Sequence, residues 1–311
     1  MTQSSSKPPR RLAPLAGEKP PAPQWFEDAL AAPRSEGSVE IEGAEISFRR
    51  WGDPGKPGLL FVHGGLAHKS WWDFAAPFFT RTHSVAAFDL SGMGDSGWRD
   101  AYRMSLYADE AVGVAEAAGL TQADGKFAIV GHSFGGWVSL ATARDHGGRL
   151  SRAMVLDSPI RPPDAPRGAT PPSSAPRFYA SQADAIGRFR LVPDQDSGEL
   201  FLLDHIARNG LKTVTDSEGK EVWTWKFDTE LWAKMSYDGG HPSTFLPDIS
   251  APLAFLRGAH SALVTDDVWD YMKTIVPAGT PTVSIPAAYH HLMMDQPIAI
   301  ITALRTILAG E

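Results

Sequence analysis

The sequence has 311 residues and contains no cysteine. Disulfide bonds, thiolate catalysis and cysteine-ligated zinc are therefore excluded. A chain without cysteine suits a reducing compartment, so we expect a cytoplasmic protein.

Long apolar runs and polybasic runs are missing as well. No window approaches 18 continuous apolar residues, so we expect no helix that spans a membrane. The formal net charge is −7 without a cluster of lysine and arginine, which argues against a nucleic-acid-binding surface. Residues 1–23 hold six prolines and a serine cluster but no apolar core of a secretory signal, and we expect residues 1–35 to be a flexible segment in which a short helix at 25–32 docks on the body.

The remaining sequence alternates between strand and helix patterns. A hairpin pattern at 38–51 precedes apolar runs typical of buried parallel strands, at 58–63, 84–89, 126–131, 153–157, 252–257 and 281–285. Helical periodicity separates these runs, at 106–118, 135–143, 266–275 and 298–308. The alternation predicts an α/β fold with about eight strands, mostly parallel, and helices on both faces of the sheet.

The alternation stops between residues 158 and 251. Helical patterns there, at 182–190 and 199–209, predict an inserted helical cap over 161–246, with the α/β core at 36–160 and 247–311. Within the cap, residues 223–227 alternate like a short edge strand or an extended arm. The cap is rich in aromatic residues, namely Trp223, Trp225, Phe227 and Trp232. An aromatic cap favours an apolar or aromatic small-molecule ligand.

Gly131-His-Ser133-Phe-Gly135 lies between a buried strand and a helix of small residues. In this context a G-x-S-x-G segment predicts a sharp turn that projects the serine hydroxyl from the sheet. The N-terminus of the following helix favours negative charge that develops beside the serine. Ser133 is therefore the candidate nucleophile.

The glycine loop after the first parallel strand is the candidate oxyanion hole. Acyl transfer needs backbone N–H donors aimed at the developing oxyanion. We expect these donors to be the amides of Phe134 and Gly65, with Leu66 as the alternative to Gly65. His63 precedes this turn, and we interpret it as an organiser of the loop rather than the base.

Four segments between residues 38 and 311 resemble the α/β-hydrolase superfamily: 62–65, 88–97, 131–136 and 288–297. The resemblance implies a catalytic base on the loop after the last strand, seven residues before a proline. Pro297 makes that residue His290 rather than His291. Where the family usually has a glycine-x-glycine before this histidine, residues 287–289 are Ala-Ala-Tyr, which predicts a stiffer loop.

The resemblance implies two places for the acid of a catalytic triad. The commoner place, the turn after the seventh strand, holds Ser261 instead of a carboxylate. Asp266 follows at a helix start, where an acidic residue is explained by capping and the helix dipole. The other place is the end of the sixth strand, where Asp157 lies. We expect Asp157, with Asp266 as the alternative.

These residues predict a serine hydrolase that cleaves a carboxylic ester or lactone through an acyl-enzyme, without cofactor or metal. Ser133 argues against the family members that use an aspartate nucleophile, such as haloalkane dehalogenases and epoxide hydrolases. Carbon–carbon bond hydrolases and perhydrolases use the same serine and stay open, as does a ligand receptor built on the fold. The sequence leaves the natural substrate and the oligomeric state undetermined.

Overall fold

A computed structural model describes residues 10–165, 175–195 and 199–310. Its centre is an eight-stranded sheet in which β1 and β2 are antiparallel to their neighbours and all other pairs are parallel. The strands in spatial order are β1 Arg34–Ile41, β2 Ala44–Trp51, β4 Ser84–Phe88, β3 Gly58–Val62, β6 Phe127–His132, β7 Leu150–Leu156, β11 Leu253–Gly258 and β12 Thr282–Ile285. The prediction of about eight, mostly parallel strands is confirmed.

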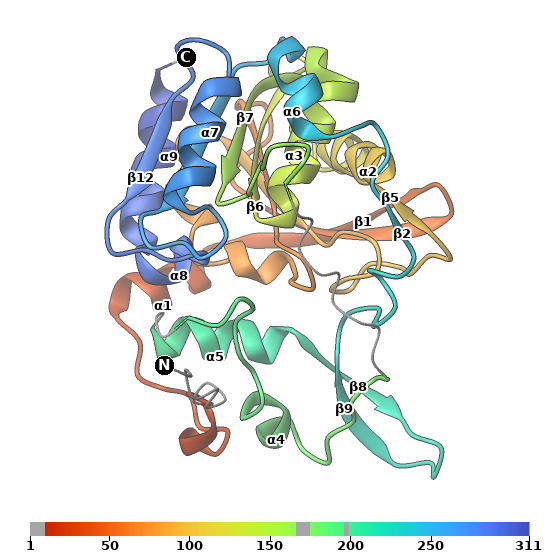
Figure 1. Ribbon diagram of the computed structural model, residues 1–311. Helices are drawn as coiled ribbons and strands as arrows, with labels where there is room; N and C mark the ends of the chain where they lie inside the picture. Colours follow the sequence, from red (N-terminus) through yellow and green to blue (C-terminus); the bar gives the residue numbers. More distant parts are fainter. Residues whose placement is uncertain (1–9, 166–174, 196–198, 311) are drawn as a thin grey trace.

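Helices pack on both faces of this sheet (Figure 1). The core helices are α1 Gln24–Ala31, α2 Met104–Ala117, α3 Phe134–His146, α7 Asp266–Ile275, α8 Leu292–Asp295 and α9 Pro297–Ala309, with single turns η1 Ala13–Leu15, η2 Lys69–Trp72, η3 Ala76–Phe79 and η4 Gly147–Arg149. No helix in the described ranges has the length and apolar character needed to cross a bilayer.

Two hydrophobic cores result, one on each face. Leu60 and Val62 of β3 belong to the core under α2, α3 and α7, whereas Leu59 and Phe61 belong to the core under α1, α8 and α9. Successive side chains of a strand point to opposite faces, so a continuously apolar strand feeds both cores. This is why the parallel strands carry apolar runs rather than alternation.

The insert between β7 and β11 contains strands as well as helices, and β9 Glu221–Trp225 overlaps the alternating stretch at 223–227 expected to be extended. It contains α4 Gln182–Ile186, α5 Leu200–Asn209, the antiparallel pair of β8 Leu211–Thr215 and β9, the short strand β10 Met235–Ser236, α6 Pro242–Phe245 and η5 Leu246–Asp248. β10 pairs with β5 Tyr102–Arg103 of the core. In Figure 1, α4, α5, β8 and β9 lie together on one side of the sheet, away from α6. The alternating residues of β9 form a hairpin because a polar turn connects them to β8.

Part of the segment expected to be flexible packs on the body. Residues 1–9 lie outside the described part of the chain, but Leu12 and Phe26 are 1% and 3% exposed. Both side chains join the core that α5 and α9 share. The guanidinium of Arg208 in α5 also donates a hydrogen bond to the carbonyl of Gly17. The docked helix expected at 25–32 is present as α1, whereas the anchoring of Leu12 within the proline-rich residues is not apparent from the average composition.

Candidate active site

Ser133 occupies a strained turn between β6 and α3. Its backbone has φ 54° and ψ −117°, in the left-handed half of the map that residues with a side chain rarely adopt. A Cβ added at Gly131 would lie 2.0 Å from the carbonyl oxygen of Gly135, and one at Gly135 would lie 2.4 Å from that of His63. The turn is thus closed so tightly that both flanking positions must be glycine.

The imidazole of His290 joins Ser133 to Asp157. The Nε2 atom of His290 lies 3.0 Å from the Ser133 hydroxyl, and its Nδ1 atom lies 2.8 Å from Asp157 Oδ1. His290 and Asp157 are 2% and 1% exposed. The carboxylate accepts from Nδ1–H, which leaves the Nε2 lone pair directed at the serine.

Asp157 directly follows β7 and is itself held by two other donors. Its Oδ2 accepts from the backbone N–H of Gly258 at 2.7 Å, and its Oδ1 also accepts from the Ser261 hydroxyl at 2.6 Å. Ser261 stands where the resemblance would place a carboxylate, and here it donates to the carboxylate that arrives from β7. A buried carboxylate is stabilised by such fixed donors.

Asp266 does not reach this group. Its carboxylate pairs with Arg257 at 2.5 Å, and its side chain is 86% exposed. It lies in the first turn of α7, as expected for an acidic residue that favours the positive end of the helix dipole.

The glycine loop after β3 lies beside the start of α3. Phe134 is the first residue of α3, so its N–H has no acceptor within the helix. Gly65 is exposed, and a Cβ added there would lie 3.6 Å from the Cβ of Phe134. The N–H of Leu66 already points at Met93 Sδ, 3.1 Å away, which leaves Gly65 as the better placed second donor.

His63 connects two loops instead of facing Ser133. Its Nδ1 lies 2.7 Å from the carbonyl of Gly64, and its Nε2 accepts from the N–H of Leu90 at 3.1 Å. Burial lowers the pKa of His63, which keeps the ring neutral with one donor and one acceptor nitrogen. The loop-organising interpretation of His63 agrees with these contacts.

The insert contacts the glycine loop after β3 through Trp232. Its indole lies 2.8 Å from a Cβ placed on Gly65, and its ring centre is 5.2 Å from that of Phe134 in an edge-to-face arrangement. Trp225 instead packs within the insert, with its ring centre 5.8 Å from that of Phe189. The sequence identifies the aromatic residues of the insert only as a group. The structure shows that Trp232, one of this group, contacts Gly65 and Phe134.

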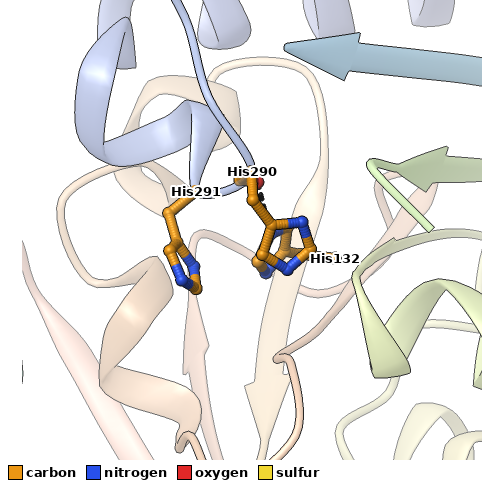
Figure 2. Close-up of side chains that lie close together, drawn as sticks. All are labelled: His132, His290 and His291. Carbon is orange, nitrogen blue, oxygen red and sulfur yellow. Dashed lines mark hydrogen bonds between the residues drawn. The ribbon is translucent and has the colours of Figure 1, made fainter. Parts of the chain in front are cut away.

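Three histidines meet beside Ser133. His132 precedes Ser133, and its Nε2 donates to the carbonyl of His290 at 2.9 Å (Figure 2). Ring centres lie 4.9 Å apart for His132 and His290, 4.7 Å for His290 and His291, and 5.4 Å for His132 and His291. Trp71 lies against this cluster, 5.4 Å from the His291 ring.

Burial lowers the pKa of both His132 and His291 well below the usual value for histidine, and the neighbouring His290 lowers it further. The backbone of Val192 opposes the shift at His291. The sequence did not predict this cluster, because His132, His290 and His291 follow no metal-binding spacing. The available signal was that the turn at Ser133 and the loop at His290 each carry an extra histidine, His132 and His291, and follow strands of the same sheet.

A family model described as "Alpha/beta hydrolase family" matches residues 59–303. Two relatives align over most of the chain. The bifunctional esterase/perhydrolase DCH of Acinetobacter calcoaceticus is 30% identical over 73% of this chain and 82% of its own length. Esterase Rv0045c of Mycobacterium tuberculosis is 25% identical over 86% of this chain and 88% of its own length. A 2-hydroxymuconate semialdehyde hydrolase of Pseudomonas sp. is 36% identical, but the match spans only 36% of that relative and 32% of this chain.

Solved structures share the fold at lower identity. E-2-(acetamidomethylene)succinate hydrolase superposes with a TM-score of 0.72 at 18% identity, covering 89% of this chain and 100% of that one. The crystal structure of Rv0045c from Mycobacterium tuberculosis gives a TM-score of 0.65 at 20% identity, covering 98% and 100%. At these sequence identities the structural similarity supports only the assignment of the fold.

Proposed function

Because the chain belongs to the alpha/beta hydrolase family, we propose that it is a serine hydrolase that cleaves carboxylic esters or lactones through an acyl-enzyme. The observation that carries this proposal is the run of hydrogen bonds from Ser133 through His290 to Asp157, at 3.0 and 2.8 Å. Nucleophile, base and orienting acid in this order are the requirement for activating a serine hydroxyl.

In the first half of the reaction, Ser133 Oγ attacks the carbonyl carbon of the substrate. The hydroxyl proton passes to His290 Nε2, and the Asp157 carboxylate holds Nδ1–H and stabilises the imidazolium. The imidazolium then gives its proton to the departing alcohol oxygen. The site is largely buried, which strengthens these electrostatic interactions.

The oxyanion of each tetrahedral intermediate accepts hydrogen bonds from the amides of Phe134 and Gly65. Water then attacks the acyl-enzyme while His290 takes its proton, and the carboxylic acid leaves as Ser133 recovers its hydroxyl. The position of Gly65 beside the Phe134 side chain and the contact of the Leu66 N–H with Met93 support this choice of donors.

The substrate we propose is a small apolar or aromatic ester or lactone. Trp232 supports this choice, since its indole covers the loop that holds the oxyanion donors. The esterase names of two relatives that align over most of the chain agree with this reaction class. The absence of cysteine favours a cytoplasmic location.

The test combines active-site labelling with turnover. Wild-type protein should react with a fluorophosphonate probe and hydrolyse p-nitrophenyl esters in repeated cycles, and Ser133→Ala should do neither. Labelling without turnover would favour a ligand receptor. Labelling that persists in Ser133→Ala would move the nucleophile elsewhere.

Perhydrolysis is the second candidate, supported by the relative named an esterase/perhydrolase. In that reaction hydrogen peroxide replaces water, attacks the acyl-enzyme and releases a peracid. Peracid formation from an acetate ester and peroxide, absent in Ser133→Ala, would establish this activity. The carbon–carbon bond hydrolase alternative rests on a match over about a third of that relative and is the weaker one.

A further inference from the structure

The three-histidine cluster at the nucleophile has more nitrogen lone pairs than the proposed reaction uses. One ring nitrogen from each of His132, His290 and His291 lies within 4.8 Å of the other two, and all three residues are buried. The triad accounts for both nitrogens of His290 alone. His132 and His291 therefore need a separate explanation.

Three of the four ring nitrogens of His132 and His291 form no hydrogen bond of normal geometry in the part of the chain that the structure describes. His132 uses Nε2 to reach the His290 carbonyl, but its Nδ1 forms no hydrogen bond within the described residues. Neither ring nitrogen of His291 forms a hydrogen bond of normal geometry within the described residues, where the ring has only an electrostatic interaction with the backbone of Val192, although the residue is about 95% buried. Buried polar atoms are nearly always hydrogen-bonded, and orphaned ones call for an explanation such as an ion.

We propose that His132, His290 and His291 form an inhibitory binding site for a divalent transition-metal ion such as Zn²⁺. His290 contributes Nε2, His132 contributes Nδ1, and His291 contributes one of its two nitrogens. Water or the Ser133 hydroxyl completes a four-coordinate shell. Imidazole nitrogen suits zinc, nickel and copper, whereas calcium and magnesium prefer oxygen ligands.

The Asp157–His290 pair strengthens such a site. Metal-binding histidines commonly donate their second N–H to a carboxylate, which fixes the ring and raises the basicity of the ligand nitrogen. Asp157 makes this contact at 2.8 Å. Bonds of about 2.0–2.1 Å to zinc hold three ligand nitrogens closer together than the 4.8 Å limit within which these lie, so small rotations of the rings suffice to bring them to a shared ion.

Inhibition follows from the use of His290 Nε2. The lone pair that would accept the Ser133 proton is the one that the metal takes, so bound metal removes the general base. The binding step is independent of the proposed function, whereas the inhibition step rests on it.

The experiment measures binding and inhibition separately. Metal-free wild-type protein is titrated with zinc chloride by calorimetry, and p-nitrophenyl ester hydrolysis is followed over the same concentrations. We expect binding of one zinc ion per chain, inhibition over the same range, reversal by EDTA and no effect of magnesium or calcium. Ser133→Ala should still bind zinc, because none of the three imidazoles is removed.

The decisive variant is His291→Asn, with His146→Asn as the matched control. His146 lies at the end of α3 and pairs with Asp109 outside the cluster. We expect His291→Asn to weaken both zinc binding and inhibition by more than about tenfold, a loss of the size seen when even an outer-shell partner is removed. His146→Asn should behave like wild type.

Two results overturn the proposal. Absence of stoichiometric zinc binding to folded wild-type protein removes the site, whatever the enzyme hydrolyses. Equal zinc inhibition of His291→Asn and His146→Asn places the inhibitory ion elsewhere. If the protein binds zinc through these histidines but hydrolyses no ester, the metal site stands and the proposed function fails.

Discussion

The Asp157→Asn substitution tests the assignment of the acid most sharply, because the structure dictates how the new amide must orient. Asp157 Oδ2 accepts from the backbone N–H of Gly258, a donor that cannot be reversed. The amide oxygen must therefore take the Oδ2 position, and the NH₂ group takes the Oδ1 position beside His290 Nδ1. An NH₂ donor there makes Nδ1 an acceptor and moves the imidazole proton to Nε2.

The size of the loss follows from this change of tautomer. A His290 that carries its proton on Nε2 cannot accept the proton of Ser133, 3.0 Å away. We expect kcat to fall by about 10³- to 10⁴-fold, the loss known for an asparagine in the acid position of a serine triad. At about 1.4 kcal/mol per factor of ten, this corresponds to roughly 4–5.5 kcal/mol of transition-state stabilisation.

The same substitution has a smaller effect on folding. Ser261 donates to Asp157 and already accepts from the N–H groups of Leu263 and Val264, so it is poorly placed to accept from a new NH₂ group. We expect the free energy of unfolding to fall by about 1–3 kcal/mol, the usual result of leaving a buried polar group mismatched. The variant should therefore stay folded at room temperature.

Asp266→Asn is the control. Its ion pair with Arg257 has an exposed carboxylate, so its loss should change stability by about 0–1 kcal/mol and kcat by less than about tenfold. Steady-state hydrolysis of a p-nitrophenyl ester, with circular dichroism as a check on folding, measures all three proteins. A larger kcat loss for Asp266→Asn than for Asp157→Asn would refute the assignment.

Three further predictions concern the nucleophile, the cap and the N-terminal segment. Ser133→Ala and His290→Ala should each lower kcat by about 10⁴- to 10⁶-fold in ester hydrolysis, whereas His291→Ala should lose far less; equal losses at the two histidines would undo the choice of base. Trp232→Ala should raise KM for aromatic esters by about tenfold with less effect on kcat, and an unchanged ranking across an ester panel would leave Trp232 a packing residue. Leu12→Ala should lower the free energy of unfolding by about 2–5 kcal/mol in urea titrations. An unchanged free energy would show that the residues around Leu12 do not pack on the body.

The sheet could be predicted from the sequence because its signals are local. Each apolar run between turn residues identifies a buried strand by itself, and the hairpin at 38–51 reads directly from alternation. A motif, a spacing and a strand end predict Ser133, His290 and Asp157, and the structure places Ser133 and Asp157 each within hydrogen-bond distance of His290. Their roles stay predictions until activity is measured.

The features that were missed all depend on contacts between distant parts of the chain. Leu12 looks like a lone apolar residue in a proline-rich segment until the core beneath it exists. The cap hairpin needed the pairing of Leu211–Thr215 with the alternating strand around Trp223. His132 and His291 are 159 positions apart, and only the fold brings the turn at Ser133 and the loop at His290 together.

Backbone strain concentrates where the proposed chemistry occurs. Leu66, Ser133 and Asp157 each adopt a positive φ, and they follow β3, β6 and β7, which are neighbours in the sheet. Such conformations cost of order 1–3 kcal/mol each and persist only where the surroundings enforce them. The enforcement is visible in the hydrogen bonds from Ser133 N–H to the Leu156 carbonyl and from Asp157 N–H to the Leu256 carbonyl, both 2.8 Å. Stability from the sheet thus fixes the serine 3.0 Å from its base before any substrate arrives, so binding energy need not be used to assemble the site.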